Sequence, residues 1–276
     1  MVSELRPRGI GEILDTAVAL YRARFRNLTL VAATVVIPVQ VVSALVLLSA
    51  QPDRYNLNVT GTVSPQYDSN SVAVAFAAVI VVTLVSVLST ALITAVCTRI
   101  VAEAYIDRHD ASITRDAVRE VRPRIVAVAG LSVLLVICEA IGILFCIVGV
   151  LVPITLFAVA LPVLILEGVS VSMAISRSVN LTKGYIGHVL GLALTARLLI
   201  IVVNFALAVG VNYLLRSGDS VVAAVIGQSI ASAIAGILTT PFAATATVAL
   251  YFDLRIRNEA FDVQLLMQRN QPRVAV

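Results

Sequence analysis

The chain has 276 residues, of which 59% are hydrophobic and 13% are charged, and its mean hydropathy is +1.00. A soluble domain needs more polar surface than this composition supplies, so a water-soluble globular fold is excluded. The net charge is +4, but aromatic residues make up only 5% of the chain. Basic side chains without aromatic stacking partners do not predict nucleic-acid binding.

Continuous apolar runs predict six membrane-spanning helices. The runs reach the length that crosses a hydrocarbon core of about 30 Å at about 1.5 Å per residue, and they do not alternate as the strands of a membrane barrel do. We therefore predict an all-α polytopic membrane protein that forms a single membrane domain over residues 1–276. Its parts are an interfacial segment at 1–27, spans at about 28–50, 72–98, 125–147, 150–166, 186–215 and 221–252, and a cytoplasmic tail at 253–276.

A stretch with the apolar spacing of an amphipathic helix precedes each odd-numbered span. We expect these helices to lie in the membrane interface before spans one, three and five. The first has Ile10, Leu14, Val18, Tyr21 and Phe25 on one face, the second has Ile113, Ala117 and Val121, and the third runs from Ser170 through Ala174 to Gly184.

The first two of these stretches share a short pattern. Ala17, Val18, Arg22 and Arg24 recur one hundred residues later as Ala117, Val118, Arg122 and Arg124. The pattern suggests a module of interfacial helix plus membrane hairpin that is repeated three times. Two alternative explanations fit this pattern: internal duplication of the module, or chance agreement between two stretches of a chain with a biased composition.

Basic residues are distributed unevenly between the two predicted sides of the membrane. The N-terminal stretch carries five arginines and the loop after span two carries six, whereas only Arg54 and Arg216 fall on the opposite side. Because Arg and Lys remain in the cytoplasm, we predict that both termini are cytoplasmic and that the basic side meets anionic headgroups of the bilayer. Gly149 and Pro153 are expected to turn the chain between spans three and four.

Four polar residues fall near the middle of the predicted spans: Gln40, Glu139, Arg197 and Gln228. A charge at the centre of a membrane helix costs about 2.5 to 3.5 kcal/mol, so Glu139 and Arg197 should face the bundle interior and pair. One interpretation is a midplane polar site of a transporter, with helices broken at Pro38, Pro153, Pro162 or Pro241. The other is a structural salt bridge that joins spans three and five.

No motif in the chain indicates catalysis. It has two histidines and lacks HExxH, GxGxxG and Walker sequences, and Cys97, Cys138 and Cys146 fall in apolar runs without CxxC spacing. We therefore predict no catalytic, metal-binding or cofactor-binding residues and a protein that is not an enzyme.

Three stretches of the chain, near its two ends and in its middle, carry distinctive combinations of residues. We call them the signature stretches. The first holds Arg6, Pro7, Gly9, Gly11, Glu12, Ile13, Leu14, Asp15, Tyr21 and Arg22; the second holds residues 162–168 with Ala174, Arg177, Ser178, Leu181, Thr182 and Gly184; the third holds Tyr251, Asp253, Leu254, Arg255, Arg257, Glu259, Phe261 and Asp262.

The signature stretches resemble those of bacterial and archaeal membrane proteins labelled "glycerophosphoryl diester phosphodiesterase membrane domain". Val179 stands where that family commonly has Trp, and Ala260 stands where Gly is usual. In fused relatives the phosphodiesterase chemistry belongs to a separate barrel with metal-binding carboxylates and histidines, for which this chain has neither the length nor the residues. The resemblance therefore implies a stand-alone membrane domain in a prokaryotic plasma membrane.

Charged residues of the signature stretches are candidates for contacts at the cytoplasmic surface. Asp253 with Arg257 and Arg255 with Glu259 are four apart, which predicts ion pairs on a helical extension of span six. This segment is either a helix end that anchors in headgroups or a docking site for a protein partner. The candidate docking residues are Glu12, Asp15, Glu167, Asp253, Arg255, Arg257 and Glu259.

Two functional hypotheses follow from these observations. The first is a non-enzymatic membrane scaffold or assembly component that contacts lipid or a protein partner through its cytoplasmic face. The second is a transporter or lipid-handling protein that uses the midplane layer of Gln40, Glu139, Arg197 and Gln228.

Overall fold

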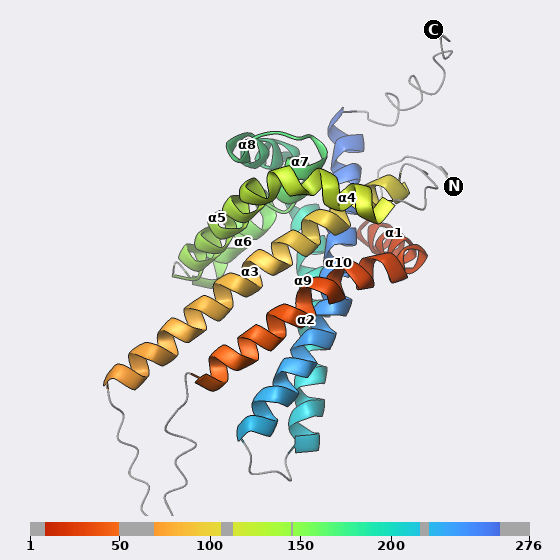
Figure 1. Ribbon diagram of the computed structural model, residues 1–276. Coiled ribbons are helices and arrows are strands. Elements are labelled where there is room, and N and C mark those ends of the chain that lie inside the picture. Colours follow the sequence, from red (N-terminus) through yellow and green to blue (C-terminus); the bar gives the residue numbers. More distant parts are fainter. Residues whose placement is uncertain (1–8, 50–68, 106–112, 145, 216–220, 260–276) are drawn as a thin grey trace, which may run out of the picture.

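The computed structural model describes residues 9–49, 69–105, 113–144, 146–215 and 221–259, which contain helices and no strand (Figure 1). Six helical segments in these ranges are long and apolar enough to cross a bilayer. The chain is therefore an all-α polytopic membrane protein, as predicted.

The described residues form ten α-helices. They are α1 (Ile10–Ala23), α2 (Phe25–Ser49), α3 (Ser69–Tyr105), α4 (Ile113–Val121), α5 (Ile125–Leu144), α6 (Cys146–Leu156), α7 (Ala160–Leu166), α8 (Val171–Thr182), α9 (Ile186–Leu215) and α10 (Val221–Glu259). The spans are α2, α3, α5, α6 with α7, α9 and α10.

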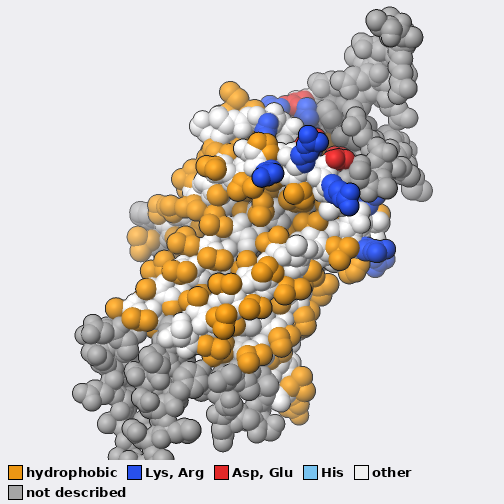
Figure 2. All heavy atoms as spheres, in the orientation of Figure 1, with side chains coloured by type: hydrophobic (Ala, Val, Ile, Leu, Met, Phe, Trp, Pro, Cys, Tyr) orange, Lys and Arg blue, Asp and Glu red, His pale blue; other side chains and the backbone are white. Residues whose placement is uncertain are grey.

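The short amphipathic helices α1, α4 and α8 gather at one end of the bundle, where the C-terminal end of α10 also lies (Figure 1). Lysine and arginine side chains collect at this end, and hydrophobic side chains are spread over the described surface below it (Figure 2). We call it the basic end, after the exposed residues Arg22, Arg26, Arg115, Arg119, Arg122 and Lys183.

Each of the three amphipathic helices has a small residue that is buried in the core of the bundle. Ala17 of α1, Ala117 of α4 and Ala174 of α8 are completely buried. Ala17 and Ala117 are equivalent positions of the repeated pattern, so its alanine marks where each helix contacts the bundle, whereas Val118, Arg22 and Arg122 are exposed. Whether the modules arose by duplication stays a prediction.

Helix α10 is the central helix of the bundle and contacts α1, α2, α3 and α9. The half of α10 that lies nearer the basic end is rich in small residues, and of these Ala244, Thr245 and Ala246 are buried. Small side chains let membrane helices approach closely, which explains this position. At 39 residues, α10 measures about 58 Å, far more than the hydrocarbon core. Its last turns carry Asp253, Arg255, Arg257 and Glu259, so this is the end that we expect to extend past the membrane surface.

The connection between spans three and four differs from the prediction. Helix α5 ends at Leu144 and α6 begins at Cys146, so Gly149 and Pro153 lie inside α6 and the predicted turn at these residues is wrong. A Cβ on Gly142 would lie 2.8 Å from the Gly149 carbonyl oxygen. Glycine therefore serves here to bring the two helices together beside the turn.

Span four is interrupted between α6 and α7, whereas Pro38 and Pro241 lie inside continuous helices. Pro153 and Pro162 flank the interruption and have no N–H to donate. The Ala160 N–H bonds to the Phe157 carbonyl instead of the Leu156 carbonyl. The Leu156 carbonyl accepts from the buried Ser178 hydroxyl of α8 at 2.8 Å. An interfacial helix thus satisfies a backbone group that the break leaves unpaired.

Replacing Ser178 should destabilise the protein through this carbonyl. Ser178→Ala keeps the packing volume but leaves a buried acceptor unsatisfied, which costs about 1 to 3 kcal/mol. We expect a lower thermal midpoint in detergent, measured by size-exclusion chromatography after heating. Ser176→Ala, on the exposed side of α8, is the control and should leave the midpoint unchanged. Equal midpoints for the two variants would contradict this role of Ser178.

Candidate functional site

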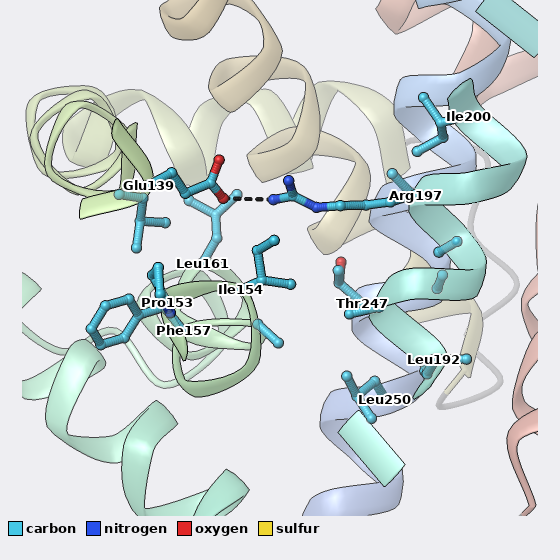
Figure 3. A pocket seen from close by; sticks show the side chains of 16 residues that line it. Glu139, Pro153, Ile154, Phe157, Leu161, Leu192, Arg197, Ile200, Thr247 and Leu250 are labelled. Carbon is cyan, nitrogen blue, oxygen red and sulfur yellow. Dashed lines mark hydrogen bonds and ion pairs between the residues drawn. The ribbon is translucent and has the colours of Figure 1, made fainter. Parts of the chain in front are cut away.

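An ion pair joins spans three and five inside the membrane. Arg197 Nη2 of α9 donates to Glu139 Oε1 of α5 at 2.5 Å (Figure 3). Glu139 lies fourteen residues after the start of α5 and Arg197 lies eleven after the start of α9. At about 1.5 Å per residue these positions are about 21 and 17 Å along their helices. The predicted pairing is confirmed.

The ion pair borders a cavity of about 280 Å³. Four spans contribute to its walls: α5, the broken span α6–α7, α9 and α10. The apolar walls include Leu135, Ile154, Phe157, Leu161, Leu192 and Leu250. Figure 3 shows Glu139 and Arg197 pointing toward each other from facing helices, with Thr247 of α10 beside them. The cavity is thus apolar with one charged end.

The charged end is accessible and not sealed by protein. The Glu139 and Arg197 side chains are 32% and 47% exposed. Apolar residues at similar depths on the same helices are also exposed, namely Ile137 and Ile143 on α5 and Leu194, Leu198 and Ile201 on α9. Because such surfaces face lipid in a membrane protein, the ion pair lies at the edge of the bundle, between two lipid-facing helices. This position differs from the predicted one in the bundle interior.

The hydrogen-bonding capacity of Arg197 is largely unused. In the part of the chain that the structure describes, Glu139 is its one hydrogen-bond or ion-pair partner. A guanidinium has five N–H donors, and donors without partners are costly where water is absent. Arg197 therefore retains donors that a polar group entering the cavity can use.

The other two residues of the predicted midplane layer lie elsewhere. Gln40 is half-buried on α2 and Gln228 is exposed on α10, and neither lines the cavity. Thr247 and Phe157, which do line it, were not among the predicted site residues. Thr247 was missed because it belongs to a run of small residues, which indicates helix packing and not a ligand site. Near Phe157, the sequence signal was the pair of flanking prolines, Pro153 and Pro162.

A second polar cluster joins the second and third signature stretches at the basic end. We call it the basic-end network; it comprises Glu167, Arg177, Tyr251, Arg255 and Glu259. Arg177 Nε donates to Glu167 Oε2 at 3.2 Å, and Arg177 Nη2 also pairs with Glu259. The Tyr251 hydroxyl donates to Glu167 Oε1 at 2.9 Å, and Arg255 Nε pairs with Glu259 Oε2 at 3.0 Å. The network joins the end of α7, α8 and the last turns of α10.

Further contacts extend this junction. Arg257 pairs with the buried carboxylate of Asp253 at 2.7 Å, and its guanidinium lies 5.3 Å from the centre of the Tyr185 ring. The Asn258 amide donates to the Leu181 carbonyl at 3.0 Å. The predicted pairs of residues four apart are thus confirmed. His188 Nε2 lies 3.4 Å from Asp253 Oδ2 but makes no hydrogen bond with the residues described.

Gly168 is required by the backbone at this junction. Its φ is +72°, a region that favours glycine, and a Cβ there would lie 2.5 Å from a terminal nitrogen of Arg124. Arg124 in turn donates to the Leu164 carbonyl at 3.0 Å. The turn after α7 is therefore held by the arginine that precedes α5.

The first signature stretch packs on α10 as well. The Tyr21 hydroxyl donates to the Leu238 carbonyl at 3.1 Å, and the Tyr21 ring lies edge-on to Phe242. Burial raises the pKa of the Tyr21 phenol above its ordinary value. On the same helix, Glu12 accepts from the Gly9 N–H at 3.2 Å, and Asp15 is exposed. All three signature stretches therefore meet on α10.

Comparisons with known proteins return no match to this chain among family models, curated proteins or solved structures. The family resemblance of the signature stretches therefore stays a prediction. Among the described residues, no group of three or more His, Cys, Asp and Glu side chains is placed to hold a metal ion.

Removing the Tyr251 hydroxyl should weaken the basic-end network. Tyr251 is buried and donates to a carboxylate, and a hydrogen bond to a charged group contributes about 1.5 to 3 kcal/mol. We expect Tyr251→Phe to lower the thermal midpoint in detergent. Tyr213→Phe, on the exposed surface of α9, is the matched control. If both variants have the same thermal midpoint as the wild type, the network does not stabilise the fold.

Neutralising the intramembrane pair should give an ordered series of stabilities. Glu139→Gln leaves a guanidinium that cannot lose its charge, Arg197→Gln leaves a carboxyl that can take up a proton, and the double variant leaves two amides. An unpaired charge costs about 2.5 to 3.5 kcal/mol at a helix centre. Folded yield should therefore be lowest for Glu139→Gln, higher for Arg197→Gln and highest for the double variant, measured by size-exclusion chromatography of a fluorescent fusion. Additive losses in the double variant would argue against the pairing.

Proposed function

We propose that this protein is a non-enzymatic transporter or lipid-handling protein that binds a small amphipathic molecule inside the membrane. The observation that carries the proposal is the apolar cavity of about 280 Å³ with the Glu139–Arg197 pair at one end. Ligand sites are mostly apolar with a few polar groups that orient the ligand, and this cavity has that composition. Charges kept inside a membrane generally mark substrate or ion pathways.

The interruption of span four supports the same proposal. Pro153, in the last turn of α6, and Phe157, in the break between α6 and α7, both line the cavity. Transporters commonly place their substrate sites where a membrane helix is discontinuous. A purely structural salt bridge would not require an adjacent cavity, nor a guanidinium with unused donors.

The scaffold hypothesis has less support from the arrangement at the basic end. Five of its seven candidate docking residues, Glu167, Asp253, Arg255, Arg257 and Glu259, pair within the chain. Their charges stabilise the junction of α7, α8 and α10, so they are poorly placed to bind a partner. Glu12 and Asp15, exposed on α1, are the candidates that remain on the surface.

We also propose an orientation and a family. The uneven distribution of arginines supports a cytoplasmic basic end, which would put both termini in the cytoplasm of a prokaryotic cell and the arginines of α1 and α4 among anionic headgroups. The meeting of the three signature stretches on α10 supports membership of the family that they resemble, because residues that define a family commonly hold its fold together.

Mass spectrometry of the protein purified in mild detergent tests the proposed function. The wild type should retain a specific lipid or small molecule that the Glu139→Gln, Arg197→Gln double variant loses. Gln228→Ala, an exposed membrane residue outside the cavity, is the control and should retain it. A stoichiometric protein partner in all three samples, with no specific small molecule in any, would overturn the proposal in favour of a scaffold.

A further inference from the structure

Of the two side chains in the ion pair, the positively charged Arg197 is more accessible to a ligand than the negatively charged Glu139. Arg197 is the more exposed of the two side chains, and its described contact is the single bond from Nη2 to Glu139 Oε1. A guanidinium presents its donors as a planar fork that matches the two oxygens of a carboxylate or phosphate. The charged end of the cavity is therefore suited to an anionic group.

Glu139 completes this arrangement as an internal counter-ion. Its carboxylate neutralises Arg197, which avoids an unpaired charge in hydrocarbon. An anionic group that binds Arg197 would compete with this carboxylate, because both need the same guanidinium. Removing the charge of Glu139 should therefore strengthen the binding of an anion and weaken the binding of a cation.

The volume of the cavity limits the apolar part of the ligand. A cavity of about 150 Å³ holds one benzene-sized group, so about 280 Å³ accommodates roughly ten to twelve carbon atoms. Because the cavity opens toward the bilayer, this volume is the part of a ligand that the protein encloses, and it suits one hydrocarbon chain. Leu192 and Leu250 line the part of the cavity nearer the basic end, and Arg197 lies deeper in the membrane.

Access to the cavity is available from the bilayer. The exposed apolar faces of α5 and α9 flank the ion pair at similar depths. A ligand dissolved in the membrane could enter between these helices without passing through water, provided that it has a hydrocarbon chain. This route excludes small hydrophilic anions, which do not partition into the hydrocarbon core.

We infer that the cavity binds a single-chain anionic amphiphile, such as a medium-chain carboxylic acid, with its head on Arg197 and its chain between α5, α6–α7, α9 and α10. The inference rests on the proposed function and adds the class of ligand. Head-group charge and chain number are its two specific claims.

Tryptophan fluorescence can test this inference directly, because the chain contains no tryptophan. Phe157→Trp places a reporter in the cavity wall, and Ile200→Trp places a second one on the α9 wall in case the first variant folds poorly. Phe205→Trp, on the exposed face of α9, reports the surrounding lipid. The variants are reconstituted in phosphatidylcholine vesicles and titrated with a brominated medium-chain carboxylic acid, whose bromine quenches a neighbouring indole.

We expect quenching of the cavity reporters to saturate and to be reversed by the unbrominated acid, whereas quenching of Phe205→Trp rises in proportion to the acid. In the cavity-reporter background, Glu139→Gln should tighten binding several-fold. Arg197→Gln should weaken it at least tenfold, and Arg197→Lys should weaken it less, because lysine keeps the charge without the fork.

Titrations with a brominated alcohol and a brominated amine of the same chain length distinguish a failure of this inference from a failure of the proposed function. If the alcohol saturates the reporters as well as the acid does, or if the amine binds more tightly, the anionic class is wrong although the cavity binds amphiphiles. If none of the three compounds gives saturable quenching at either reporter, the cavity is not a binding site and the proposed function fails as well. Saturable binding of the acid alone supports both.

Discussion

Every backbone N–H and C=O group inside a bilayer must find its partner within the protein, because hydrocarbon offers none. Continuous helices meet this requirement in α3, α5 and α9, and in α2 and α10 except at the internal prolines Pro38 and Pro241. Span four does not, and the Leu156 carbonyl that its break leaves unpaired is satisfied by Ser178 of α8. An interfacial helix is thereby fixed against the core. The position of α8 then brings Arg177 between Glu167 and Glu259, and so determines how the basic end is assembled.

The two clusters of charge differ in how completely they are satisfied. In the basic-end network, Arg177 pairs with two carboxylates and Glu167 also accepts from Tyr251, and fully connected networks of this kind make a structure rigid. The intramembrane pair has one bond, and its guanidinium retains unused donors beside a cavity. The first arrangement suits a structural junction, whereas the second suits a site that exchanges one partner for another.

The break in span four connects these two regions. Its prolines remove backbone donors, its turn residues line the cavity, and the carbonyl that it frees is bound by α8. The same local departure from helical geometry therefore shapes the proposed ligand site on one side and anchors the basic end on the other. Helix α7 is only seven residues long and connects the cavity wall at Leu161 to Glu167 of the basic-end network. The two regions are therefore close along the chain.

The sequence by itself determined the six spans, the three amphipathic helices and the ion pairs four residues apart, and it put Glu139 and Arg197 at a similar depth. These features depend on hydrophobic length, on helical periodicity and on depth, all of which are local properties of the chain. Only the tertiary structure decided that Gln40 and Gln228 lie away from the cavity and that Gly149 and Pro153 lie inside α6. It also decided that Arg177 joins Glu167 to Glu259, which lies 82 positions after Arg177 in the chain. Residues at one depth share a site only if their helices are rotated toward each other, and packing between helices sets that rotation.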